Sequence, residues 1–353
     1  MRSKVKGRKL IYRKEENDDS NNRRILYLLF ILLLTGILLS TTTYAWFTTN
    51  RMVSVNSLDV KVNAAGGIEI SADGSEWKAM LDIDDLTSVH NGNYPTSVNQ
   101  LPSYLEPTST GGDINDGKLV MYYGEVTNDS LGNYILTASR SIEEEGNGDS
   151  SSGKFLAFDL FLKTTESKDI YLTSDSKVTY QGDNSYGIEN AVRVAFILEG
   201  NTLDGSGLGT IQSLSTNDSN NVYIWEPNYD THTAYGVSNA LNVYGVSTST
   251  VGGTRIIYDG IISDISSNQN IGLNSAKASL YSNLFKTVDV DIATVNNNSN
   301  NTELFQLASG ITKVRVYLWI EGQDVDCENN ASVGDISFNL QLLLILLDFA
   351  IVF

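Results

Sequence analysis

The chain has few of the side chains that carry most catalytic and redox chemistry. Its 353 residues include one cysteine, Cys327, and two histidines, His90 and His232. A single cysteine excludes an internal disulfide. Neither histidine belongs to a His-Glu-x-x-His zinc helix, and no nucleophile elbow or phosphate-binding loop is present. We therefore expect a protein that is not an enzyme; a secreted hydrolase would have to depend on one of the two histidines.

Basic residues are scarce outside the start of the chain. The first 24 residues contain 9 Lys and Arg and 4 Asp and Glu, out of 24 and 42 in the whole chain, so the remainder contains 15 basic and 38 acidic residues, a formal charge of −23. Such a surface repels nucleic acid and anionic lipid and favours solubility or divalent cations. Nucleic acid is excluded as a partner.

Charge is also missing from residues 25–47, although a basic segment, residues 1–24, precedes them. A helix of this length spans about 30 Å of hydrocarbon. The positive-inside rule keeps residues 1–24 in the cytoplasm and exports the chain after Phe47. We expect one N-terminal hydrophobic helix that contacts the membrane, at least before any processing.

Two fates are open for residues 25–47. They can remain as a single-pass anchor. Alternatively they form a secretory signal, because Thr43 and Ala45 place small residues three and one positions before a cut ahead of Trp46. Cleavage between Ala45 and Trp46 is the alternative favoured by the short strongly apolar part, Ile25 to Leu39.

The exported part has the pattern of short strands separated by Gly, Asn, Ser and Asp. Alternating apolar residues over Val53–Val62 indicate a half-buried strand, and Asp73-Gly74 is typical of a hairpin turn. Helical periodicity is weak and is confined to residues 76–86 and 276–285. We predict a mainly β domain, an antiparallel β-sandwich or jelly roll with long polar loops, over residues 48–342. Further strands are expected at residues 118–126, 133–139, 155–163, 170–173, 177–181, 191–199, 222–225, 254–258, 313–321 and 335–342.

Two segments of the exported part share one pattern. Residues 192–200 and 314–322 each place Arg between two valines and continue with an apolar run and Glu-Gly. Apolar runs of this length suit central strands that are covered on both faces. We predict that the two segments are adjacent core strands, although strand composition alone can produce such a match.

Acidic side chains and aromatic side chains each suggest a binding site. Asp324 and Asp326 follow the second core strand and are the best candidates for calcium, which takes six to eight oxygen ligands. A solvated acidic loop is the alternative. No other cofactor is expected.

The middle of the chain is rich in aromatic residues, namely Tyr223, Trp225, Tyr229, Tyr235 and Tyr244. Exposed aromatics could stack on sugar rings, although such residues more often pack in a core.

The C-terminal tail, residues 343–353, is strongly apolar but is interrupted by Asp348 and is too short to span a bilayer. It can be a last buried strand, a strand offered to a neighbouring subunit, or the product of a shifted reading frame. An uncovered tail of this kind would promote aggregation.

The segment from Thr43 to Asn50, followed by the strand Val53–Val62, resembles the TasA/camelysin family of exported proteins of Gram-positive bacteria. The resemblance covers about residues 25–65. It implies a jelly-roll subunit, removal of the leader by a dedicated signal peptidase, and assembly into biofilm-matrix fibres in which the N-terminal strand completes the sheet of the next subunit. The resemblance therefore implies a strand-exchange role for Val53, Val55, Leu58, Val60 and Val62. The long basic leader, the larger exported part and the apolar C-terminus depart from the family pattern, and the protease activity described for camelysin has no matching metal motif here.

Two functions follow as hypotheses. The first is an exported structural protein of the cell surface or extracellular matrix of a Gram-positive-like bacterium, which associates with itself by β-strand exchange. The second is a membrane-anchored adhesion or glycan-binding domain that does not polymerise.

Overall fold

The computed structural model describes residues 23–31, 52–62, 67–143, 153–182, 187–234, 236–238, 258–290, 303–327 and 334–344. The chain divides into two compact units, residues 1–43 and 44–353. In the first unit, residues 23–31 are helical. Within the described part of the chain, no helix combines the length and the hydropathy needed to cross a membrane.

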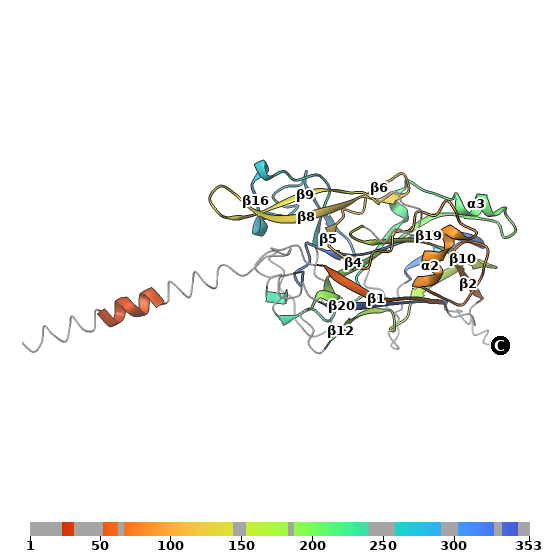
Figure 1. Cartoon of the computed structure of the whole chain (residues 1–353), viewed down its shortest axis with the longest axis horizontal. Coiled ribbons are helices and arrows are strands. Elements are labelled where there is room, and N and C mark those ends of the chain that lie inside the picture. The colour runs from red at the N-terminus through yellow and green to blue at the C-terminus, as the bar shows by residue number, and fades with distance from the viewer. Residues whose placement is uncertain are drawn as a thin grey trace, which may run out of the picture. The chain divides into compact units, whose positions relative to one another are not determined.

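The second unit is mainly β, and seven of its strands form a first large sheet. Strand β1 lies inside this sheet, between β20 on one side and β3 and β4 on the other; β20 also pairs with β11 and β12, and β18 lies at the far edge (Figure 1). The strands are β1 (Val53–Val62), β3 (Met80–Asp82), β4 (Tyr104–Leu105), β11 (Lys168–Leu172), β12 (Lys177–Gln181), β18 (Phe305–Leu307) and β20 (Asp335–Leu344).

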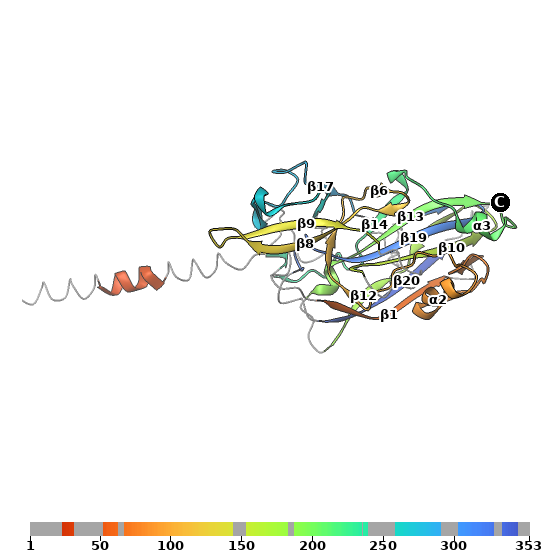
Figure 2. The same ribbon diagram turned by 45° about the horizontal axis from the view of Figure 1, so that its top comes forward.

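Nine strands form the second large sheet, with β19 at its centre. β13 lies on one side of β19 and β10 on the other (Figure 2). β5 pairs with the last two residues of β19. The strands are β2 (Ile68–Ser71), β5 (Pro107–Ser109), β8 (Met121–Asn128), β9 (Tyr134–Ser141), β10 (Leu156–Thr164), β13 (Val192–Thr202), β14 (Val222–Trp225), β16 (Ile271–Gly272) and β19 (Gly310–Glu321).

The remaining elements are short. Two further pairs of strands are β6 (Ile114–Asn115) with β7 (Lys118–Leu119), and β15 (Tyr258–Ile261) with β17 (Phe285–Val288). The helices whose bounds fall within the described residues of this unit are α2 (Ile83–Ser88), α3 (Leu208–Gln212), η2 (Val89–Asn91), η3 (Ile188–Ala191), η4 (Ser219–Asn221), η5 (Ser267–Gln269) and η6 (Leu273–Ser275), and residues 236–238 are helical as well.

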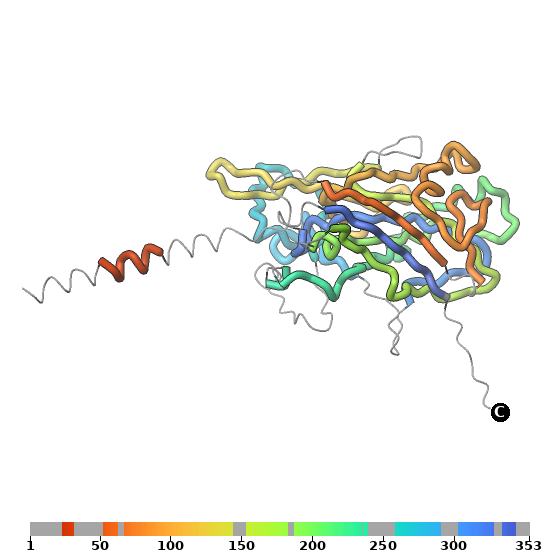
Figure 3. Tube along the Cα trace, turned by 60° about the horizontal axis from the view of Figure 1, so that its bottom comes forward, coloured from red at the N-terminus to blue at the C-terminus, as the bar shows by residue number. Residues whose placement is uncertain are grey.

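The prediction of a mainly β protein is confirmed, but a purely antiparallel arrangement is wrong. β1 runs parallel to β20, with Leu58 opposite Phe338 and Val60 opposite Leu340. β19 also pairs in parallel with β5. The first and last strands of the described β region therefore lie side by side, as the orange-red and dark blue tubes of Figure 3 show. Sequence alternation sets which face of a strand is buried, and carries no information on strand direction.

The main core contains side chains from both large sheets. Val60 and Leu340 of the first sheet belong to the same cluster of buried residues as Val194, Phe196 and Val316 of the second. The opposite face of the second sheet is covered as well, because Ala195, Tyr317 and Trp319 pack with Tyr258 and Val288 of the β15–β17 pair. β13 and β19 are thus apolar on both faces, which explains their continuous apolar runs.

The two segments that share the Val-Arg-Val pattern are neighbours, as predicted. β13 and β19 pair antiparallel over ten residue pairs, from Val192 opposite Ile320 to Thr202 opposite Ile311. In this register Arg193 faces Trp319, and Arg315 faces Ile197. Trp319 and Arg315 are four residues apart on one strand, so both arginines lie on the same face of the sheet.

The two helix predictions are wrong over most of their length. Residues 276–285 form turns, and β17 begins at Phe285. In the other segment the α-helix begins only at Ile83, where Asp82 caps it and Asp85 returns the capping bond. Residues 80–82 instead pair with β1 as β3. Pairing with an existing sheet therefore overrides a weak helical pattern in this segment.

Candidate functional site

The predicted calcium ligands lie in the turn that follows β19, and both are buried. Asp324 is 1% exposed and Asp326 is 0% exposed. The backbone N–H of Asp326 donates to Oδ1 of Asp324 over 2.8 Å. The two carboxylates therefore face the protein interior, where every charge needs a partner.

Arg193 of β13 is the partner of Asp324. Its Nη2 atom lies 2.5 Å from Oδ2 of Asp324 and 2.8 Å from Oε1 of Glu226, and all three side chains are at most 1% exposed. Its Nη1 atom donates to the backbone carbonyls of Asn190 and Val192. Glu226 directly follows β14, the neighbour of β13 in the sheet, so sheet pairing brings the arginine and this glutamate together.

His232 joins the two ends of this group, which we call the Arg193 cluster (Arg193, Glu226, His232, Asp324 and Asp326). Nδ1 of His232 lies 2.8 Å from Oδ2 of Asp326, and Nε2 lies 3.0 Å from Oε1 of Glu226. Burial alone lowers the pKa of His232, but the hydrogen bonds to Asp326 and Glu226 outweigh that effect and raise it to about 10. In the protein without a bound metal, the ring is therefore an imidazolium that donates through both nitrogens.

Asp326 is held by donors from two other segments. Its Oδ2 atom accepts from the side chain of Asn190 over 3.1 Å and from the backbone N–H of Thr233 over 3.2 Å. These contacts fix the carboxylate toward His232. Calcium binding by Asp324 and Asp326 stays a prediction; in this geometry Arg193 is the cation beside Asp324, and the ring of His232 is the cation beside Asp326.

Another buried carboxyl group, Glu321, lies beside the cluster on β19. Burial raises its pKa to about 8, against the hydrogen bonds that it accepts from Trp319 Nε1 and the backbone N–H of Gln323. Glu321 is therefore mostly neutral at pH 7. It adds a polar group to this region without adding a full charge.

The second arginine of the shared pattern has its own carboxylates. Nη1 of Arg315 lies 2.7 Å from Oδ1 of Asp159, and Nη2 lies 2.7 Å from Oε2 of Glu143. Tyr94 donates to Asp159 over 2.7 Å, and Tyr317 donates to Glu143. The repeated arginines thus each compensate two buried carboxylates on the outer face of the second sheet.

The residues assigned to strand exchange lie on β1, and most face the main core. Val53 and Val60 are 0% exposed, Leu58 is 1% and Val62 is 7%, and Val55 packs against the same cluster. β1 is hydrogen bonded along both edges, to β20 and to β3 and β4. In this structure the strand completes the sheet of its own chain.

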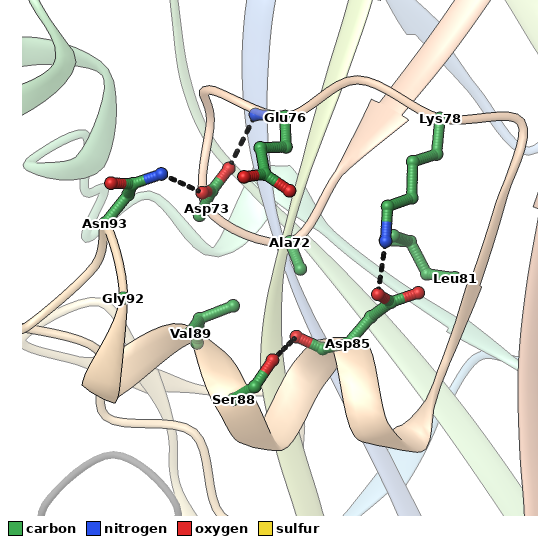
Figure 4. Close-up of a pocket in the computed structure, with 10 residues that line it drawn as sticks. All are labelled: Ala72, Asp73, Glu76, Lys78, Leu81, Asp85, Ser88, Val89, Gly92 and Asn93. Atoms are coloured by element: carbon green, nitrogen blue, oxygen red, sulfur yellow. Dashed lines mark hydrogen bonds and ion pairs between the residues drawn. The ribbon is translucent and has the colours of Figure 1, made fainter.

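A small pocket of about 120 Å³ lies between the loop after β2 and helix α2 (Figure 4). Its walls carry Asp73, Asp85 and Lys78, and Lys78 forms an ion pair with Asp85. Burial raises the pKa of Asp73, but the N–H groups of Glu76 and Ser75 and the neighbouring hydroxyls lower it to about 2. Asp73 therefore stabilises the conformation of its loop, because its carboxylate oxygens accept hydrogen bonds from these groups.

A larger pocket of about 510 Å³ lies along β12. Half-buried Tyr180 and Tyr229 line it together with polar side chains that include Lys177 and Asp230. Asn228 joins the wall of the pocket to β12, because its side-chain amide accepts from the backbone N–H of Val178 and donates to the backbone carbonyl of the same residue. Tyr229 is therefore one member of the aromatic-rich middle that lines a recess.

The other aromatics of that middle region have different positions. Trp225 is 0% exposed and belongs to the main core, and Tyr223 packs against the same core. Tyr235 and Tyr244 lie outside the described residues. The predicted cleavage site, Ala45 and Trp46, and the tail beyond Leu344 also lie outside them.

Comparison of the chain with protein-family models, with curated proteins and with solved structures finds no match. The resemblance to the TasA/camelysin family therefore stays a hypothesis that rests on the residues quoted for it.

Proposed function

We propose that the protein is an exported, non-enzymatic structural component of the cell surface or extracellular matrix that associates with itself by exchange of β1. The basic leader and the uncharged segment 25–47 support export across a membrane, with processing between Ala45 and Trp46. We also infer that the two large sheets are the layers of a sandwich of the jelly-roll type, since they share one core.

One observation carries this proposal. β1 is parallel to β20 and is buried against the core. The first strand of the β region therefore lies beside its last strand. A β1 strand from another chain would make the same ladder and bury the same side chains. Exchange of β1 therefore replaces contacts within one chain by the same contacts between two chains, as in domain swapping.

The contacts of β1 are substantial. Its four most buried aliphatic residues, Val53, Leu58, Val60 and Val62, each contribute about 1.5–3 kcal/mol by burial, or about 6–12 kcal/mol together. A chain that lost β1 would expose an apolar groove beside β20. Only another strand of the same pattern would cover it, which favours self-association over binding of unrelated partners.

Electron microscopy and size-exclusion chromatography of the chain that begins at Trp46 test the proposal. We expect oligomers or fibres whose abundance rises with protein concentration. A sample that stays monomeric at the highest concentration attainable, with and without calcium, would contradict the assembly claim.

The pocket along β12 favours a second candidate function, a membrane-anchored adhesion or glycan-binding domain. Tyr180 and Tyr229 offer ring faces, and Lys177 and Asp230 offer polar groups, which is the combination that sugar rings require. A glycan array probed with the wild-type protein and with Tyr229→Ala tests this function. Binding that Tyr229→Ala abolishes and Tyr134→Ala, at an exposed position of β9, leaves intact would support it.

A further inference from the structure

Three side chains of the Arg193 cluster have the composition of a transition-metal site. One carboxylate oxygen each from Glu226 and Asp324 and one ring nitrogen of His232 lie within 4.8 Å of one another. They come from three segments: the end of β14, the loop that follows it, and the turn after β19. An ion at this point would join segments almost 100 residues apart.

The cluster also contains a buried ligand atom without a partner. Glu226 is 0% exposed, and among the described residues its Oε2 atom has no hydrogen-bond donor. The hydroxyl of Tyr258 and Nε of Arg193, in the same buried region, also lack a hydrogen-bond partner within the described part of the chain. A buried carboxylate oxygen without a donor is unfavourable, and such atoms often indicate an ion or a water molecule.

The surroundings of His232 fit a metal-binding histidine. Such histidines usually give one ring nitrogen to the metal and donate the other N–H to a carboxylate, which fixes the ring. Here Nδ1 faces Asp326, which Asn190 and Thr233 hold in place, while Nε2 points to Glu226. The ring is therefore oriented so that Nε2 is the ligand atom.

The charges of the cluster leave room for a divalent cation. Glu226, Asp324 and Asp326 supply three negative charges, and Arg193 supplies one positive charge. With a neutral His232 the sum is −2, which one divalent ion balances. Because no described residue donates to Oε2 of Glu226, this residue can bind the ion while its Oε1 keeps the ion pair with Arg193.

We propose that Glu226, His232 and Asp324 bind one divalent ion of the zinc class, with Asp326 as the carboxylate that orients His232. A ligand set of one imidazole and two carboxylates is typical of zinc, whereas calcium needs six to eight oxygen ligands. Zinc ligands at about 2.0–2.2 Å lie roughly 3.3 Å apart, and the three ligand atoms here lie within 4.8 Å of one another, so binding requires only small movements of these side chains. The ion would fasten the segment that follows β14 to the turn that follows β19, and this role does not depend on strand exchange.

Zinc titration of the full-length chain in detergent tests the site. After treatment with a chelator and dialysis, we expect one zinc per chain by elemental analysis and a rise in Tm that saturates at equimolar zinc. Calcium at the same concentration should shift Tm less. Cobalt(II) in place of zinc should give the visible absorption bands of low-symmetry four-coordinate cobalt, and this measurement needs no variant.

Matched variants identify the ligands. His232→Gln and Glu226→Gln should weaken zinc binding at least tenfold, and Asp326→Asn should weaken it about 10–100-fold. His90→Gln, the same change at the other histidine, should bind zinc as the wild type does. The proposal is overturned if wild-type protein retains no zinc and shows neither the Tm shift nor the cobalt bands, if calcium stabilises it more than zinc, or if His232→Gln binds zinc normally. The first result would leave the cluster as an ion-pair network closed by a protonated His232.

Discussion

Replacing Leu58 by alanine measures how far β1 supports the fold. Leu58 lies in the middle of β1, is 1% exposed and pairs with Phe338 of β20. Truncation of a buried leucine costs about 2–5 kcal/mol, the larger values applying where neighbours cannot collapse into the cavity. β1 is bonded on both edges, so we expect a loss of about 3–5 kcal/mol in the free energy of unfolding. At about 2 °C per kcal/mol for a domain of this size, Tm falls by about 6–10 °C.

Urea unfolding followed by tryptophan fluorescence measures this loss, because Trp225 and Trp319 are fully buried. The control is Asn56→Ala, at an exposed position of the same strand, which should change stability by less than about 0.5 kcal/mol. If Leu58→Ala and Asn56→Ala unfold at the same urea concentration, β1 does not contribute to the core and the reasoning fails.

Three further changes test the rest of the fold. Arg315→Met removes the nearest cation of Asp159 and Glu143 and leaves them Lys313 and Lys118, which lie at 3.3 and 3.4 Å. The free energy of unfolding in urea should therefore fall by about 3 kcal/mol, the lower end of the range for a broken buried pair, and an unchanged midpoint would contradict the ion-pair assignment. Burial raises the pKa of Glu199 from 4.5 to about 7, so its contribution to stability is present below pH 4.5 and is lost as the pH rises through 7. Glu199→Gln should therefore remove up to about 3 kcal/mol of the decline between pH 4.5 and 8, and a urea midpoint with the wild-type pH dependence would refute this assignment. Gly310 has φ +109°, and a Cβ there would lie 2.2 Å from the backbone carbonyl oxygen of Thr202 in β13. Gly310→Ala should therefore lower Tm by several degrees, whereas Gly207→Ala, where a Cβ meets no other atom, should not. Equal Tm values for the two variants would show that the backbone adjusts freely.

The strands with clear alternation or long apolar runs could be predicted from the sequence. β1, β12 and β14 have the predicted bounds, and the shared Val-Arg-Val pattern correctly placed β13 beside β19. These predictions succeed because the spacing of apolar residues along a strand shows whether one or both of its faces are buried.

Pairing direction and the Arg193 cluster could not be predicted in the same way. The parallel pair of β1 and β20 joins residues about 280 positions apart, and nothing in either strand specifies its partner. The sequence shows Asp324 and Asp326 as acidic residues after a core strand, but Glu226 and His232 reach them only through the pairing of β14 with β13 and β13 with β19. The signal available was the arginine inside an apolar run, because a buried guanidinium requires buried carboxylates nearby.

Cross-linking of β1 to β20 tests the central claim most directly. Ser57 and Ser337 are paired on neighbouring strands and are both half-buried, so Ser57→Cys with Ser337→Cys allows a disulfide between β1 and β20. The chain that begins at Trp46 is assembled at high concentration, oxidised and run on a non-reducing gel, with each single variant as the control for the buried Cys327. Strand exchange predicts a ladder of covalently linked chains in the double variant only. If every cross-link joins β1 and β20 of the same chain, so that only monomers appear, the exchange of β1 is contradicted.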